Sequence, residues 1–202
     1  MKTISSYNKT VSPSKVICIG RNYAAHIKEL NNEIPKDMVI FNKPNSAISD
    51  TLRFFSQDTR YEGEICFLIK DNAIDAVGFG LDLTKADEQN YLKKKSLPWE
   101  RSKSFDGAAV FGNFVKLPEN ISKIRLELYI NSELIQHGKY EQMIYKPQKM
   151  IDEINSFMTL EDGDIIMSGT PKGVGTYKKN DIFEGKLYLE DELLVSSSWV
   201  VV

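Results

Sequence analysis

Cysteine is scarce in this 202-residue chain, which contains only Cys18 and Cys66. Both cysteines lie inside apolar, strand-like runs, where a reduced and buried thiol is the usual state. We therefore predict two free thiols rather than a disulfide. A thiolate is also a poor partner for hard oxygen ligands, so Cys66 is not expected to join the neighbouring glutamates at a metal site.

A large excess of charge of either sign is also absent. The formal net charge is -2, and acidic and basic residues are scattered along the chain. This leaves no basic stripe for nucleic acid and no polybasic anchor for a membrane surface. Residues 1–15 lack the apolar core of a secretory signal or a membrane span. We expect a small-molecule partner, neither nucleic acid nor membrane as a partner, and a cytoplasmic location.

The sequence shows no internal repeat, no low-complexity tract and no shift in composition. With 42% hydrophobic residues, the chain is long enough to bury one sizeable core. Strand-like runs outnumber helical ones, so helices are expected to be the minority. We predict one domain over residues 16–202, preceded by an N-terminal extension over residues 1–15.

An acidic pair in the stretch 60–69, RYEGEICFLI, gives the clearest indication of chemistry. Its β-branched and aromatic residues predict a strand, and alternation then puts Glu62 and Glu64 on one face, about 7 Å apart. Asp82 could complete a cluster of hard oxygen ligands of the kind that selects Mg²⁺ or Mn²⁺. The alternative is a pair of solvated carboxylates on an amphipathic strand. Gly63 leaves the opposite face bare, which is typical of a strand that crosses a cavity rather than one in mid-sheet.

The segment 21–30 predicts a helix with Asn22 as its N-cap. Such a helix places His26 and Glu29 at positions i and i+3, on the same side. A carboxylate there can orient the imidazole and raise its basicity, which makes the pair a general-base candidate near neutral pH. The alternative is an ordinary surface pair, but the chain contains only two histidines, and this favours a function.

Several other polar residues allow two interpretations each. Lys43 ends a predicted strand over residues 38–44, where it faces an anionic substrate or is solvated. The lysines of the run 93–95 suit the C-terminus of a helix predicted over residues 86–95 and need no further role. The glycine-rich segment 168–175 lacks the ending of a phosphate-binding P-loop, which argues against a nucleotide. It is either a tight turn or a donor of backbone N–H groups and the Thr170 hydroxyl to a carboxylate.

Taken together, these motifs resemble the fumarylacetoacetate hydrolase family, in particular its small single-domain branch of acylpyruvate hydrolases and oxaloacetate decarboxylases or tautomerases. The similarity runs from Lys15 to about Leu194 and depends on the order and spacing of short motifs. These motifs are GRNYAAH (20–26), KP (43–44), YEGE (61–64), DLT (82–84) followed by Asp87 and Gln89, LPW (97–99), KSF (103–105) and SGTPKGVG (168–175).

The resemblance implies a β-rich α+β fold, with mixed β-sheets in a roll or sandwich, a few short helices and a homodimeric assembly. It also implies a Mg²⁺ or Mn²⁺ cofactor. The pair His26 and Glu29 would be a catalytic dyad on a segment that becomes ordered over the bound ligand. The implied site residues fall into three groups: metal ligands Glu62, Glu64 and Asp82; catalytic residues His26, Glu29 and Lys103; and substrate contacts Arg21, Gln89 and Thr170.

A 2-oxo acid is the substrate class that fits such a site. It can chelate a divalent ion through its carboxylate and 2-oxo oxygens, and the ion then stabilises an enolate. For an acylpyruvate, His26 oriented by Glu29 would deprotonate a water that attacks C4, while Lys103 neutralises the developing charge. Oxaloacetate would instead lose CO₂ or exchange a proton at C3. The alternatives are isomerisation or decarboxylation of a longer 2-oxo-dioic acid from aromatic degradation, and a catalytically silent relative that only binds an oxo acid.

One departure from the family pattern concerns substrate recognition. Close relatives usually carry Ala-Arg-Asp after the Asp-x-Thr/Ser turn, where this chain has Lys85-Ala86-Asp87. An arginine there could hold a carboxylate through two parallel hydrogen bonds, which neither alanine nor a displaced lysine reproduces. Specificity for the distal group of the substrate is therefore left open.

Overall fold

A computed structural model describes residues 1–7, 9–29 and 36–202, with the backbone alone for residues 26–28. Its larger sheet has ten strands. These are β1 (Ile4–Ser6), β2 (Lys9–Val11), β3 (Lys15–Gly20), β4 (Val39–Pro44), β5 (Ile48–Ser49), β6 (Thr59–Lys70), β7 (Ala73–Lys85), β8 (Ala109–Lys116), β11 (Ile165–Met167) and β12 (Gly175–Thr176). The strand order is β2-β1-β8-β7-β6-β11-β3-β4, with β5 beside β8 and β12 beside β6.

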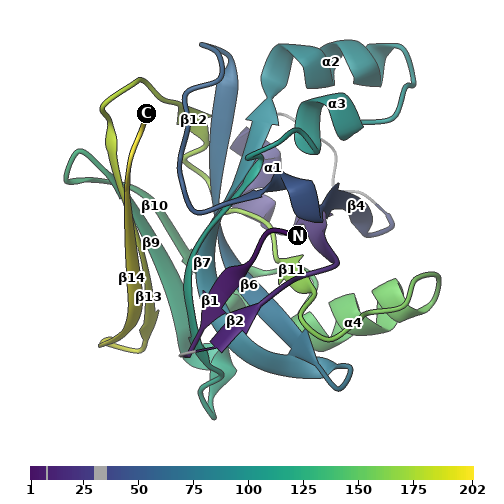
Figure 1. Cartoon of the computed structure of the whole chain (residues 1–202), viewed down its shortest axis with the longest axis vertical. Helices are drawn as coiled ribbons and strands as arrows, with labels where there is room; N and C mark the ends of the chain where they lie inside the picture. The colour runs from purple at the N-terminus through teal and green to yellow at the C-terminus, as the bar shows by residue number, and fades with distance from the viewer. Residues whose placement is uncertain (8, 30–35) are drawn as a thin grey trace.

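The smaller sheet is antiparallel and stands at the left of Figure 1, in the order β10-β9-β13-β14. Its strands are β9 (Ile124–Ile130), β10 (Glu133–Lys139), β13 (Ile182–Leu189) and β14 (Glu192–Val200). The larger sheet mixes parallel pairs such as β11–β3 with antiparallel pairs such as β6–β7. The predicted β-rich fold of mixed sheets is confirmed.

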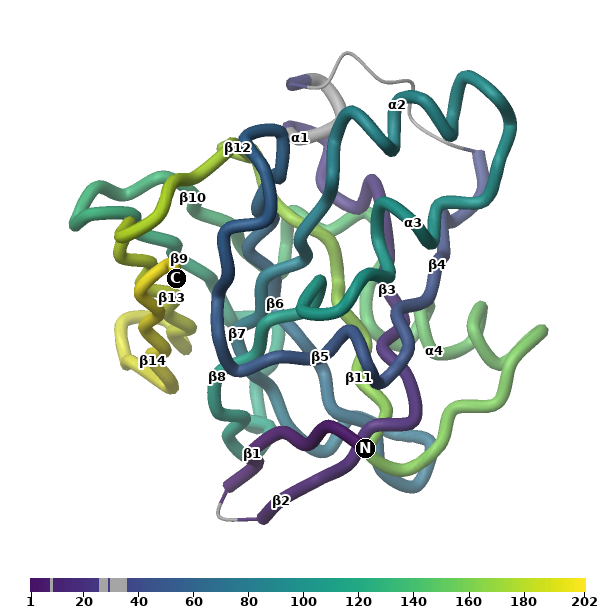
Figure 2. The backbone as a smooth tube through the Cα atoms, turned by 45° about the horizontal axis from the view of Figure 1, so that its top comes forward, coloured from purple at the N-terminus to yellow at the C-terminus, as the bar shows by residue number. Residues whose placement is uncertain are grey.

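Helices are few and short, as the sequence predicts. They are α1 (Ala24–Glu29), α2 (Ala86–Lys94), α3 (Glu100–Lys103) and α4 (Pro147–Asn155), with 3₁₀ turns η1 (Asn45–Ala47), η2 (Ile121–Lys123) and η3 (Tyr140–Gln142). Helices α2 and α3 lie side by side at one end of the molecule (Figures 1 and 2). Among the described residues, no helix combines the length and the apolar character that crossing a bilayer requires.

The alternation along β6 explains where the core and the site lie. Odd-numbered residues such as Ile65 and Phe67 pack into a large core shared with residues of the smaller sheet, among them Leu128 and Phe183. Even-numbered residues face the other way, where Cys66 joins a second apolar cluster built from strands of the larger sheet. The acidic residues of β6 lie at one end of this second face. Both cysteines are buried and free, as predicted.

The expectation that the strand crosses a cavity at Gly63, away from mid-sheet, is wrong. β6 lies between β7 and β11 in the middle of the larger sheet. The N–H of Gly63 donates to Oε1 of Gln136 at 2.9 Å, across the gap between the two sheets. A Cβ at Gly63 would lie 3.0 Å from that oxygen and 3.0 Å from the Phe79 ring. Glycine is needed there because the Gln136 side chain approaches the strand closely.

The predicted N-cap of the first helix is also wrong. Helix α1 begins at Ala24, and the buried Asn22 side chain connects two other segments. Its Nδ2 donates to the carbonyl oxygens of Ser168 at 2.8 Å and Tyr145 at 3.1 Å, and its Oδ1 accepts the N–H of Tyr145 at 2.6 Å. Asn22 therefore fixes the strand-to-helix turn against the glycine-rich segment rather than starting the helix.

Part of the predicted N-terminal extension belongs to the larger sheet. β1 and β2 pair with each other, and Ser6 of β1 pairs with Phe114 of β8 in parallel orientation. Asp164, at the start of β11, accepts hydrogen bonds from the backbone N–H groups of Ser14 and Lys15. Residues 1–15 therefore contact the rest of the molecule, and a domain boundary at residue 15 stays a prediction.

Candidate active site

The three carboxylates grouped by the sequence lie together in the structure. Glu62 and Asp82 face each other across the β6–β7 pair, and Glu64 follows two residues along the same face of β6. One oxygen from each side chain lies within 4.8 Å of the others. Glu64 is 3% exposed and Asp82 is 1% exposed. Like charges opposite one another destabilise a sheet, so this arrangement requires cations nearby.

Lys103 supplies one of those cations from the end of α3. Its Nζ lies 2.6 Å from Oε2 of Glu62 and 2.9 Å from Oδ2 of Asp82. Burial alone would lower the pKa of Lys103, but Asp82 and Glu62 outweigh that effect and hold the pKa above its ordinary value. The two carboxylates therefore favour the protonated ammonium, which suits charge stabilisation.

Lys43 supplies the second cation, and its place overturns the interpretation as a solvated lysine. The side chain is fully buried, and its Nζ lies 2.8 Å from Oδ1 of Asp82. It also donates to the carbonyl oxygen of Lys103 and, at 3.4 Å, to that of Leu83. Lys43 thus holds Asp82 on one side and the end of α3 on the other.

Glu64 is held by the backbone rather than by a lysine. Its Oε2 accepts the N–H of Gly169 at 2.6 Å. Burial, followed by the neighbouring Asp82 and Glu62, raises the pKa of Glu64 well above its ordinary value. The glycine-rich segment was predicted to offer N–H groups to a bound carboxylate, but this N–H is directed to a carboxylate of the protein itself.

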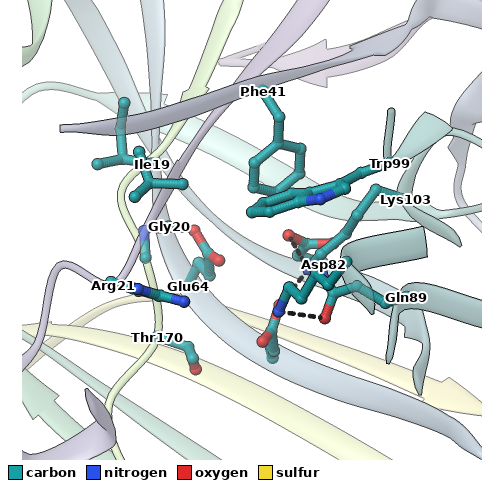
Figure 3. Close-up of a pocket in the computed structure, with 14 residues that line it drawn as sticks. Ile19, Gly20, Arg21, Phe41, Glu64, Asp82, Gln89, Trp99, Lys103 and Thr170 are labelled. Atoms are coloured by element: carbon teal, nitrogen blue, oxygen red, sulfur yellow. Dashed lines mark hydrogen bonds and ion pairs between the residues drawn. The ribbon is translucent and has the colours of Figure 1, made fainter. Parts of the chain in front are cut away.

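The three carboxylates open into a small cavity of about 60 Å³, shown in Figure 3. Phe41 and Trp99 form an apolar wall on one side, with ring centroids 6.0 Å apart. The remaining lining comes from β3, the turn after it, β4, α2, α3 and the glycine-rich segment: Ile19, Gly20, Arg21, Val39, Gln89, Lys93, Lys103, Gly169 and Thr170. An ion together with a small acid matches this size better than a nucleotide does.

All three predicted substrate contacts line the cavity. Arg21 enters it from the turn after β3, where the backbone has φ +58°, a value that non-glycine residues rarely adopt. Gln89 faces Arg21 from α2 on the opposite side (Figure 3). The Thr170 hydroxyl donates to the carbonyl oxygen of Gly63 and accepts a hydrogen bond from Gln136, each at 2.9 Å. The roles of these residues in binding stay predictions.

Of the predicted catalytic dyad, His26 and Glu29, the structure describes only the Glu29 side chain. His26 and Glu29 both belong to α1, but the side chain of His26 lies outside the described residues. The Glu29 carboxylate accepts the N–H of Gly173 at 3.0 Å and 3.1 Å through its two oxygens. This contact places α1 beside the segment that contributes Gly169 and Thr170 to the cavity. The second histidine, His137, is exposed on β10 and does not line the cavity.

Sequence reasoning missed Gln136, which no motif indicates. This buried residue of β10 accepts the Gly63 N–H and donates to Thr170 Oγ1 at 2.9 Å and to the Pro171 carbonyl at 3.0 Å. It therefore connects the glutamate strand with the glycine-rich segment. Because the contact crosses between two sheets, neither strand periodicity nor chain proximity could have identified it.

The donor set fits a hard divalent cation. Fully ionised, the three carboxylates carry three negative charges, and Lys43 and Lys103 carry two positive ones, so the cluster has an excess of negative charge. Carboxylate oxygens at this spacing are ligands of Mg²⁺ and Mn²⁺, and among the side chains that the structure describes no sulfur or imidazole belongs to the cluster. Metal binding would relieve the repulsion between Glu62 and Asp82.

Comparison with known proteins agrees with this geometry. The fumarylacetoacetate (FAA) hydrolase C-terminal family matches residues 15–195. The chain is 35% identical over 192 residues to the human mitochondrial oxaloacetate tautomerase FAHD1, covering 86% of each chain. It is 34% identical over 187 residues to the oxaloacetate tautomerase YcgM of Escherichia coli, covering 83% of this chain and 85% of that one. A crystal structure from Oleispira antarctica, provisionally named a fumarylacetoacetate isomerase/hydrolase, has a TM-score of 0.93 with 35% identity and covers 100% of both chains.

Proposed function

Because the chain belongs to the fumarylacetoacetate hydrolase C-terminal family, we propose that it is a divalent-metal-dependent enzyme acting on a short 2-oxo acid through an enolate. The observation that carries this proposal is the cluster of Glu62, Glu64 and Asp82 in the wall of a cavity that also contains Lys103. Tautomerisation of oxaloacetate is the reaction we favour, since the human and E. coli relatives are named for it.

Glu62, Glu64 and Asp82 would hold the ion, and their oxygens suit Mg²⁺ or Mn²⁺. When bound, the ion would act as a Lewis acid that polarises the 2-oxo group and stabilises the charge of the enolate. Lys43 keeps one oxygen of Asp82 engaged at 2.8 Å, which fixes the orientation of that carboxylate toward the cavity.

Lys103 would neutralise the charge that develops on the substrate. Its pKa is raised by the adjacent carboxylates, the residue is 4% exposed, and it lines the same cavity as they do. A buried cation already in place costs no solvent reorganisation when an anion forms beside it. Phe41 and Trp99 exclude water from one side of the cavity, which strengthens this electrostatic effect.

Hydrolysis of an acylpyruvate is the second candidate, and the position of α1 favours keeping it. The contact between Glu29 and Gly173 places the helix that carries His26 beside the cavity segment. In this reaction His26 would accept a proton from the attacking water, and Glu29 would orient its imidazole. Keto-enol exchange of oxaloacetate needs no water, only the transfer of a proton between C3 and the 2-oxo oxygen.

The proposal is tested by following the near-ultraviolet absorbance of enol oxaloacetate with purified protein. We expect accelerated decay of the enol, loss of activity with a chelator, and recovery with Mg²⁺ or Mn²⁺. Glu62→Gln and Asp82→Asn should each reduce the rate by about 100-fold or more while the circular dichroism spectrum is retained. Metal-independent turnover, or unchanged rates in both variants, would reject the mechanism.

A parallel assay separates the alternatives. Faster turnover of acetylpyruvate than of oxaloacetate would assign the protein as a C–C hydrolase, and release of CO₂ from oxaloacetate would assign a decarboxylase. Turnover restricted to a longer 2-oxo-dioic acid would indicate an enzyme of aromatic degradation. Tight binding of oxalate with no turnover of any oxo acid would indicate a silent relative. A cytoplasmic location and a homodimer stay predictions.

A further inference from the structure

The lining of the cavity includes a cation that the carboxylate cluster does not engage. Lys93 belongs to the last turn of α2 and lines the cavity together with Arg21 and Lys103. Lys103 is engaged by Glu62 and Asp82, but no carboxylate among the described residues forms an ion pair with Lys93. Lys93 therefore adds a positive charge to the cavity lining away from the ion pairs of the cluster.

Lys93 is held in place by neutral groups. Its Nζ donates to Oε1 of Gln89 at 3.1 Å, one helical turn earlier, and lies 5.1 Å from the centroid of the Trp99 ring. Gln89 and Trp99 both line the cavity. These contacts orient the ammonium of this exposed residue, and neither partner carries a formal negative charge.

The electrostatic surroundings of Lys93 disfavour its charge in the absence of an anion. Its pKa is lowered, first by partial burial and then by the positive charges of Arg21 and Lys103. Three cations thus line one small cavity, and a bound anion would relieve their repulsion. Lys94, the last residue of α2, and Lys95, its C-cap, do not line the cavity, so Lys93 is the member of the lysine run that does.

We infer that Lys93 is the specificity-determining residue that binds the second carboxylate of a dicarboxylic 2-oxo acid. The inference builds on the proposed function, in which the first carboxylate and the 2-oxo group face Glu62, Glu64 and Asp82. A substrate of this kind carries a second negative charge beyond the group that faces the carboxylate cluster. A neutral acyl group, as in an acylpyruvate, would leave the Lys93 ammonium without a partner. The substrate class is therefore a short dicarboxylic 2-oxo acid.

The first arm of the test is kinetic and uses Lys93→Met, Lys93→Arg and, as the matched control, Lys94→Met. We expect Lys93→Met to raise the KM for oxaloacetate about 10-fold or more, as the loss of one charge-assisted hydrogen bond predicts. The inhibition constant of 2-oxobutanoate, which has the same length but lacks the second carboxylate, should change less than about 2-fold, since it has no charged group for Lys93 to bind. Lys93→Arg should recover most of the loss, and Lys94→Met should behave as the wild type.

The second arm is independent of turnover and measures binding by calorimetry to the Mg²⁺-loaded protein. 2-Oxoglutarate should bind more tightly than 2-oxopentanoate to the wild type, and Lys93→Met should abolish this preference. Equal binding of the two acids by the wild type, an unchanged preference in Lys93→Met, or equal effects of Lys93→Met and Lys94→Met would overturn the inference. If the wild type turns over no oxo acid, the proposed function fails, and the calorimetric preference still decides the role of Lys93.

Discussion

Two lysine ammonium groups hold the central carboxylate of the site. Lys43 contacts Oδ1 of Asp82 and Lys103 contacts Oδ2, so both oxygens of this nearly inaccessible side chain are paired. Removal of one partner from a buried ion pair leaves an uncompensated charge and is strongly destabilising. The lysines therefore allow three acidic side chains to coexist in the interior before any ion or substrate is considered.

Replacement of Lys43 by Met is expected to destabilise the metal-free protein by about 3–5 kcal/mol, because Asp82 loses a buried partner. Saturating Mn²⁺ should recover much of that loss, since the ion supplies the missing positive charge to the same carboxylates. Urea denaturation with chelator and with Mn²⁺ measures both effects. The exposed Lys116→Met serves as the control. An equal destabilisation with and without Mn²⁺ would show that Lys43 does not act through the carboxylate cluster.

For individual residues, the sequence predicted the acidic side chains of the site but not the lysines that form ion pairs with them. Strand alternation is a local rule, and it was sufficient to place Glu62 and Glu64 on one face. The ion pair between Lys43 and Asp82 joins β4 to β7, two strands that are not neighbours in the sheet. No local pattern carries that information, and the usual tendency of lysine to be solvated pointed the wrong way.

At the scale of the elements, the buried carboxylate of Asp164 connects the starts of two strands. Asp164 directly precedes β11, and it binds the residues at the start of β3. Asp164 accepts hydrogen bonds from the backbone N–H and the hydroxyl of Ser14, from the backbone N–H of Lys15 and from the N–H of Glu161. The Lys15 ammonium lies 2.5 Å from Oδ2 of Asp164. Burial alone would raise the pKa of Asp164, but these donors outweigh it and lower the pKa below its ordinary value.

Asp164→Asn should therefore destabilise the protein by about 2–3 kcal/mol at pH 7, the range for hydrogen bonds to a charged group. A lowered pKa in the folded state stabilises the protein above the unfolded pKa of about 4, and that stabilisation is lost as the pH falls through the folded value. The difference between wild type and variant should thus be constant from pH 8 to 5 and shrink below pH 4. Chemical denaturation across this range checks it, and a difference that grows toward low pH would contradict it.

The strands were easier to predict from the sequence than the helices. The runs that form β3, β4, β9 and β13 have strong β-branched and aromatic content, and the structure places strands there. Helix α3 was missed because the segment 97–107 is rich in turn-forming and charged residues. The start of α1 was misplaced because the Asn22 side chain binds distant carbonyl groups instead of capping the helix.

At the scale of the whole molecule, the two sheets pack closely through glycine. A Cβ at Gly185 of β13 would lie 2.3 Å from two atoms of the Phe79 ring of β7. The aromatic ring of the larger sheet therefore lies directly on the backbone of the smaller one. The sequence could not predict this contact, because it depends on which strands face one another rather than on the pattern within either strand.

Gly185→Ala should destabilise the protein by about 1–3 kcal/mol, the cost of overpacking a core where the neighbour is a fixed ring. Gly20→Ala is the control, since a Cβ there would lie no closer than 3.3 Å to the side chain of Val39 and 3.7 Å to that of Phe41. Thermal denaturation of both variants measures the difference. Equal stability of the two variants would show that the sheets can separate without cost.

The central claim is that the three acidic side chains hold a single divalent ion, and calorimetric titration of the metal-free protein with Mn²⁺ tests it most directly. We predict one ion bound per chain in the wild type. Glu64→Gln and Asp82→Asn should each weaken binding by about 100-fold or more while the protein stays folded, because a neutral amide is a poor ligand for a hard cation. Glu161→Gln, a carboxylate outside the cavity, should bind as the wild type does. Undiminished binding in both site variants, or no binding by the wild type, would contradict the account.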